Sequence, residues 1–129
     1  MRIFICEQDP YRAKLIQDIL GVYNYKIITV NDQNDLFRQA YSRKPAVIVM
    51  SEMFPKKSAG EMLQKLRMDP VTSKIPVIFI GSRSLMEEQV FHQHLFDNLT
   101  EFLPEPIKIK NLRHYIDRWT TLRSLYIKH

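Results

Sequence analysis

Residues that could take part in chemistry stand just after four short apolar runs of this sequence. These positions are Glu7, Gln8 and Asp9, then Ser51 and Glu52, then Gly81 and Ser82, and finally Pro104 and Glu105. The carboxylates of Glu7 and Glu105, with the hydroxyl of Ser51, are oxygen ligands of the kind that hard divalent cations accept. Asp9 suits a helix cap better, because Pro10 follows it. Glu7 is therefore the single candidate metal ligand, and neither a complete metal site nor a cofactor is expected.

Other reactive side chains are less informative. Cys6 is the only cysteine, so no internal disulfide can form, and its apolar neighbours predict a small buried residue rather than a nucleophile. His92 and His94 are two residues apart, a spacing that points them to different faces of a helix and does not favour a metal site. Ser51 could be the target of a serine kinase, or a hydroxyl bonded to the local backbone.

Strand-like and helix-like segments alternate five times along the chain. The strand-like runs are 2–6, 25–30, 46–50, 75–80 and 101–103. The helix-like segments are 10–21, a helix capped by Asn31 or Asp32, 58–69, 85–96 and about 107–127. This alternation predicts an α/β domain, with a doubly wound, five-stranded parallel sheet and helices on both faces. In such a sheet functional residues gather beyond the carboxyl ends of the strands, which is where the residues named first would lie.

Composition indicates one soluble domain. The chain has 129 residues, of which 45% are hydrophobic and 26% charged, and no linker or repeat divides it, so residues 1–129 are expected to form a single unit. No apolar run reaches the ~20 residues that span a bilayer, and no signal-peptide pattern is seen at the start. We therefore expect a cytoplasmic protein without membrane contact. The net charge of +5 arises from Ile107 onward, where six basic residues accompany one acid.

Four segments together resemble the receiver domain of bacterial response regulators. They are PAVIVMSEMFP (45–55), LRMDP (66–70), KIPVIFI (74–80) and FLPEP (102–106). The resemblance covers nearly the whole chain and implies a flavodoxin-like, CheY-like sheet with strand order 2-1-3-4-5.

The same resemblance implies phosphoryl transfer to an aspartate, and several of the required residues are replaced here. That chemistry needs a carboxylate nucleophile, an acidic pair that holds a divalent cation, a hydroxyl and a lysine. The corresponding residues are Ser51 as the acceptor, Glu7 and Gln8 as the pair, Gly81 as the hydroxyl residue and Glu105 as the lysine. Glu105 in place of lysine would leave the site without its usual cation and repel phosphoryl oxygens. These replacements predict a degenerate pseudo-receiver. Glu52 could instead mimic a phosphate.

The resemblance also implies a surface for partners, made by the fourth helix, the fifth strand and the last helix. Phe102 occupies the position of the family's switch aromatic, whose coupling to the acceptor site would be broken by Gly81. Pro106 corresponds to a proline that follows a cis peptide bond. Tyr115 and Trp119 belong to an apolar stripe of the last helix, part of which must pack on the sheet. A protein partner, including a second copy of the chain, is expected on this surface.

These observations favour a non-enzymatic protein-interaction module that signals without phosphorylation. Three alternatives stay open: an active receiver with a non-standard site, a small-molecule sensor that reuses the altered pocket, and a nucleic-acid-associated regulator. The last would use the basic residues Arg113, Arg118 and Arg123 of the final helix. No helix-turn-helix pattern accompanies them, so nucleic acid is not the expected partner.

Overall fold

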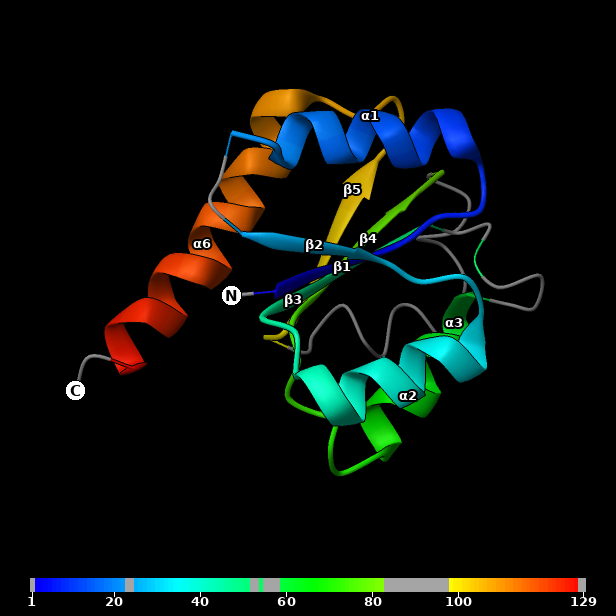
Figure 1. Cartoon of the computed structure of the whole chain (residues 1–129). Coiled ribbons are helices and arrows are strands. Elements are labelled where there is room, and N and C mark those ends of the chain that lie inside the picture. The colour runs from blue at the N-terminus through cyan, green and yellow to red at the C-terminus, as the bar shows by residue number, and fades with distance from the viewer. Residues whose placement is uncertain (1, 23–24, 52–53, 55–58, 83–97, 128–129) are drawn as a thin grey trace.

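The computed structural model of the chain describes residues 2–22, 25–51, 54, 59–82 and 98–127 (Figure 1). Within these ranges strands and helices follow one another in the order that the sequence predicts. The predicted helix over 85–96 lies outside the described residues, as do Glu52 and Pro55. No helix in the described ranges is long and apolar enough to cross a membrane.

Five parallel strands form one sheet in the order β2-β1-β3-β4-β5, which confirms the predicted sheet. The strands are β1 (Arg2–Cys6), β2 (Lys26–Thr29), β3 (Val47–Ser51), β4 (Val77–Gly81) and β5 (Thr100–Pro104). The strand order reverses between β1 and β3. Because a crevice opens beyond the carboxyl ends of the strands at such a reversal, the residues that follow β1 and β3 are the first place to look for a site.

The helices begin where the sequence supplies caps. Those of the described residues are α1 (Pro10–Leu20), α2 (Gln33–Arg43), α3 (Ala59–Met68) and α6 (Ile109–Ile127). Asp9 caps α1 by accepting a hydrogen bond from the Tyr11 N–H at 3.1 Å, and Asp32 caps α2 through the Asp35 N–H at 2.8 Å. Both caps confirm the sequence prediction, because a short acceptor side chain satisfies N–H groups that the first turn leaves unpaired.

Two apolar layers lie on the two faces of the sheet. Alternate residues of β1 point to opposite sides: Phe4 and Cys6 pack with residues of α2 and α3, whereas Ile3 and Ile5 pack with residues of α1 and α6. Figure 1 shows α1 and α6 on one side of the sheet and α2 and α3 on the other. Every residue of β3 and β4 is buried, as expected for central strands covered on both faces.

Strand ends differ slightly from the prediction. β4 begins at Val77 instead of 75, because Pro76 has no N–H for the ladder, although its carbonyl accepts from the Ile48 N–H at 2.9 Å. The strand also runs one residue past the predicted end at 80, because Gly81 is the last residue of β4 and pairs with Pro104. This extension brings the end of β4 against the end of β5, where the Glu105 N–H donates to the Gly81 carbonyl at 3.0 Å.

Candidate functional site

The predicted site residues meet at the carboxyl edge of the sheet. Ladder pairing aligns Cys6 with Met50 and Ser51 with Ile80, so the ends of β1, β3 and β4 lie next to one another. Glu7 and Ser51 are buried there, whereas Gln8 is exposed. The backbone itself therefore brings the predicted positions together, whatever side chains they carry.

Glu7 carries a carboxylate that the fold almost removes from water. Its side chain is 1% exposed, and its Oε1 lies 2.8 Å from Nε of Arg12. Its Oε2 accepts from the Asp9 N–H at 3.3 Å. Burial of a charge without a partner is costly, whereas an opposite charge and a hydrogen bond offset that cost. Arg12 is therefore the opposite charge that compensates the buried carboxylate of Glu7.

Arg12 also forms an ion pair with Glu105, through Nη2 and Oε1. One guanidinium thus joins the residue that follows β1 to the loop between β5 and α6, and we call this group the Arg12 bridge (Glu7, Arg12 and Glu105). Arg12 is 26% exposed and Glu105 31%, so this half of the bridge is partly screened by solvent. Both contacts are ion pairs by distance, and among the described residues neither Nε nor Nη2 of Arg12 has a hydrogen-bond partner.

Glu105 stands where the family supplies a lysine, yet the site does not lack a positive charge. Arg12 supplies a positive charge from α1, an element on which the sequence analysis singled out only the cap. A signal was available: Asp9 and Pro10 fix the start of α1 at the edge of the sheet, so a long basic side chain in its first turn can reach over that edge. A cation near a helix N-terminus is unfavourable unless acids compensate it, and Glu7 and Glu105 do so.

The Arg12 bridge is a poor ligand set for a divalent cation. Mg²⁺ prefers several oxygen ligands in octahedral geometry, but Glu7, the candidate ligand, has a guanidinium 2.8 Å from Oε1. Within the ranges that the structure describes, no group of three or more His, Cys, Asp or Glu residues is placed to hold a metal ion. The residues present at this edge do not fit the cation that a receiver's chemistry requires.

The acceptor position is enclosed rather than open. Ser51 is 1% exposed, and its carbonyl accepts from the Phe54 N–H at 3.0 Å. Gly81 is buried and Ser82 half-buried.

Beside the Arg12 bridge there is a hollow of about 250 Å³, lined by Arg12, Leu15, Glu105, Pro106 and Ile107.

The residues predicted for switching and partner contact differ in exposure. Phe102 is buried in the core on the α2 and α3 side, so its ring points inward. Trp119 is only 8% exposed and packs on the sheet with Leu112 and Ile116. Trp119 is therefore part of the core and not of the predicted partner surface, because spacings of four and three residues place all three side chains on the inner face of α6.

The loop after β5 and the adjoining turn of α6 remain more accessible than these core residues. Pro106 is exposed and follows a cis bond from Glu105, as expected. Tyr115 is half-buried against the α1 and α6 layer. The fourth helix, which would complete the predicted partner surface, lies outside the described residues.

The basic residues of α6 make contacts within the chain. Arg118 pairs with Glu101 of β5, with Nη1 2.6 Å from Oε1, and its guanidinium lies 5.3 Å from the centre of the Trp119 ring. Arg113 donates from Nε to the Ile19 carbonyl of α1 at 3.4 Å. The side chain of Arg123 lies outside the description. Two of the three arginines considered for nucleic acid therefore help to hold α6 in place.

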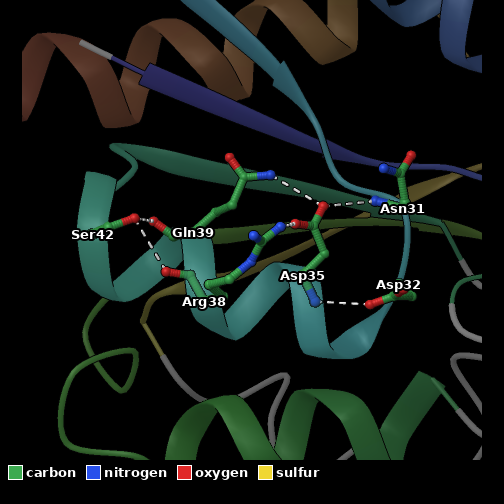
Figure 2. A network of polar contacts seen from close by, with 6 residues as sticks. All are labelled: Asn31, Asp32, Asp35, Arg38, Gln39 and Ser42. Carbon is green, nitrogen blue, oxygen red and sulfur yellow. Dashed lines mark hydrogen bonds and ion pairs between the residues drawn. The ribbon is translucent and has the colours of Figure 1, made fainter.

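A second polar cluster, which the sequence analysis did not identify, surrounds Asp35 at the start of α2 (Figure 2). The Asp35 carboxylate accepts from the Asn31 N–H at 3.2 Å and from Gln39 Nε2 at 3.1 Å, and it pairs with Arg38. The hydrogen bond from Arg38 is the main cause that lowers the pKa of Asp35. All these partners belong to α2 or to the residues just before it, so the cluster stabilises the start of the helix.

Comparison with known proteins gives a consistent result. No protein-family model matches the chain. The response regulator GraR of Staphylococcus saprophyticus is 26% identical over 95 residues, 74% of this chain and 41% of GraR. Protein PilH of Pseudomonas aeruginosa is 24% identical over 113 residues, 86% of this chain and 93% of PilH. The chain spans less than half the length of the first curated relatives it matches.

Solved structures agree with these relatives. The chemotaxis response regulator CheY4 of Vibrio cholerae has a TM-score of 0.75 at 15% identity, covering 91% of this chain and 96% of CheY4. The receiver domain of sensor histidine kinase PA1611 from Pseudomonas aeruginosa, solved with a magnesium ion in its active site cleft, has a TM-score of 0.74 at 19% identity, covering 92% and 95%. Fold, relatives and structural neighbours together support a response-regulator receiver domain of the CheY-like type, as used in bacterial two-component signalling.

Proposed function

We propose that this chain is a receiver domain that signals through protein contacts without being phosphorylated on aspartate. The observation that carries the proposal is the Arg12 bridge, which fills the carboxyl edge of the sheet with an internal ion-pair network. In a phosphorylatable receiver that edge would hold a divalent cation, a phosphoryl group and a lysine. Here the charges are already matched to one another, with two carboxylates around one guanidinium.

Electrostatics support this proposal in two ways. A phosphoryl group entering the site would meet the carboxylate of Glu105 where the family supplies a cation, and like charges at close range repel. The guanidinium of Arg12 could compensate only by leaving Glu7, whose side chain is 1% exposed. Leaving a buried carboxylate unpaired would cost about 3 kcal/mol or more. The charges of the site therefore disfavour phosphoryl transfer, in addition to the absence of a carboxylate nucleophile at Ser51.

The output would be a contact with another protein, on the surface that includes β5 and α6. The described part of this surface carries the Arg118–Glu101 ion pair and the exposed Pro106. Phe102 and Trp119 contribute from the core, because their buried side chains pack β5 and α6 against the rest of the domain. Input would come from the abundance of the chain or of its partner, and no enzymatic step is assigned to it.

The first test is incubation of the purified chain with acetyl phosphate and Mg²⁺, followed by intact-mass measurement. An unmodified mass is expected under conditions in which a receiver with an intact aspartate gains a phosphoryl group. A Mg²⁺-dependent added phosphoryl group on the unaltered chain would establish the active-receiver alternative and refute this proposal.

Nucleic-acid binding is not favoured by the contacts that the arginines of α6 make within the chain. Arg118 is paired with Glu101 and Arg113 contacts the carbonyl of Ile19, so both would have to give up these contacts to neutralise phosphates fully. Salt-dependent binding to duplex DNA, lost in the variant R113Q/R118Q, would reverse this conclusion.

A further inference from the structure

Three exposed apolar side chains lie together at the ends of α2 and α3. Tyr41 is 49% exposed, Met68 76% and Val71 48%. The Tyr41 hydroxyl donates to the carboxylate of Asp69, which stands between Met68 and Val71 in the chain. We call these four residues the Tyr41 surface. Its residues belong to α2, to the end of α3 and to the turn after it, and Figure 1 shows α2 and α3 on the opposite face of the sheet from α1 and α6.

The Tyr41 surface is held in shape by contacts between its elements. Besides the bond to Asp69, the ring of Tyr41 lies 6.5 Å from that of Phe37, at an interplanar angle of 54°. The Val71 N–H donates to Oδ1 of Asp69 at 2.8 Å. An aromatic side chain fixed in advance loses little conformational freedom on binding, and tyrosine is enriched among residues that dominate binding energies. Met68 adds a flexible side chain that adapts to a partner.

The exposed charged residues near this surface in the chain are mostly positive. Lys44, Lys65 and Lys74 are exposed. Lys44 stands three residues after Tyr41, and Lys65 stands three residues before Met68 on the same face of α3. Lys74 follows Ser73, whose N–H donates to the Asp69 carbonyl at 2.8 Å. The acid within the patch, Asp69, already accepts from Tyr41 and Val71. Exposed apolar side chains that have exposed lysines near them in the chain are complementary to an apolar stripe flanked by acids.

We propose that the Tyr41 surface binds an acidic amphipathic helix of a partner protein. Apolar side chains of that helix would cover Tyr41, Met68 and Val71, and its Asp or Glu residues would face the lysines, a common mode of peptide recognition. A lipid surface fits less well, because membrane binding by a protein surface draws on a helix that inserts a long apolar face. Here the apolar side chains come from two packed helices and a turn, with a carboxylate at their centre.

The test is a titration of the whole ¹⁵N-labelled chain with a synthetic amphipathic helix that carries leucines on one face and glutamates on the other. Saturable amide shifts confined to 37–44 and 65–74 are expected. A matched peptide with lysine in place of glutamate should bind at least ~10-fold more weakly, since charge complementarity sets the preference. The triple variant K44E/K65E/K74E should reverse the preference between the two peptides.

Two further variants distinguish binding at the Tyr41 surface from non-specific binding. Y41S should weaken binding of the acidic peptide about 10-fold, because it removes the central aromatic contact, whereas Y11S changes an exposed tyrosine on α1 and should leave binding unchanged. Circular dichroism checks that both variants are folded. No shifts at millimolar peptide, equal binding of both peptides, or equal losses in the two variants would refute the proposal. Binding to phosphatidylglycerol vesicles that depends on Tyr41 and exceeds peptide binding would replace it with a membrane contact.

Discussion

Two carboxylate–arginine clusters at the start of two helices perform different tasks. In the Arg12 bridge, Arg12 of α1 pairs with Glu7, which follows β1, and with Glu105, which follows β5. In the polar cluster around Asp35, which we call the α2 cluster, Arg38 pairs with Asp35 three residues away on the same helix. The first links segments distant in sequence at the receiver site, and the second stabilises one helix end. The same kind of ion pair therefore contributes differently to the fold, depending on whether its partner lies on the same helix or on a distant segment of the chain.

The exposure of the two arginines sharpens this contrast. The side chain of Arg12 is 26% exposed, and its partner Glu7 is almost fully buried. The side chain of Arg38 is 78% exposed, and Asp35 keeps hydrogen bonds from Asn31 and Gln39 if Arg38 is removed. The free energy of unfolding should consequently depend strongly on Arg12 and weakly on Arg38.

The largest effect is expected for R12M, which leaves the buried Glu7 carboxylate without its partner. We predict a loss of about 3 kcal/mol in the free energy of unfolding, the usual range for breaking a buried ion pair. Urea denaturation at neutral pH measures it. The double variant E7Q/R12M removes the stranded charge and should recover about half of the loss. A loss under ~0.5 kcal/mol for R12M would place this pair with exposed ion pairs, which contribute little.

A smaller loss is expected for E105K, which restores the family's lysine. The new ammonium would lie near the guanidinium of Arg12, so an attraction becomes a repulsion, and a loss of about 1 kcal/mol is expected at this partly exposed position. E105Q serves as the neutral control and should lose less. If E105K is instead more stable than the wild type at low salt, the contact between Arg12 and Glu105 does not contribute as described.

Acid should weaken the α2 cluster in a defined direction. The hydrogen bond from Arg38 lowers the pKa of Asp35 from its ordinary value of 3.8. A carboxyl whose pKa is lower in the folded state stabilises the fold above its unfolded pKa, and this contribution is lost as the pH falls through the folded pKa. D35N should therefore be less stable than the wild type at neutral pH, and the difference should shrink below about pH 4. A difference that stays constant down to pH 2 would contradict this account.

The smallest effect is expected for R38A. An ion pair between residues three apart, with one side chain largely in solvent, contributes at most about 0.5 kcal/mol. Thermal unfolding of R38A and R12M in the same buffer compares the two clusters directly. Equal losses would mean that the distinction between a local and a long-range arginine is wrong.

Local chemistry explains why much of the fold could be predicted from the sequence. Asp9 and Asp32 act as caps through N–H groups two or three residues away, and the apolar run of β3 is buried on both faces. The strand order followed from the resemblance to receivers. The positions of Glu7, Ser51, Gly81 and Glu105 followed from the rule that sites form at the carboxyl ends of parallel strands.

Other features depend on side chains that meet only in the folded chain. The contacts of Arg12 with Glu105 and of Tyr41 with Asp69 join residues far apart in sequence. The start of α1 places Arg12 near the edge of the sheet, but no local pattern identifies Glu105 or Asp69 as the partner. The burial of Trp119 could not be separated from an exposed role, because one apolar stripe can serve the core or a partner. The positive charge of the site could not be assigned from the family's pattern, because it comes from Arg12 on α1 and not from the position of the family's lysine.

The measurement that tests the central claim most directly is phosphorylation of the single variant S51D. It restores a carboxylate at the acceptor position and leaves the Arg12 bridge intact. After incubation with acetyl phosphate and Mg²⁺, intact mass should show no added phosphoryl group, because Arg12 and Glu105 still occupy the edge of the sheet. Mg²⁺-dependent phosphorylation of S51D would contradict the account and show that the missing aspartate alone disables the site.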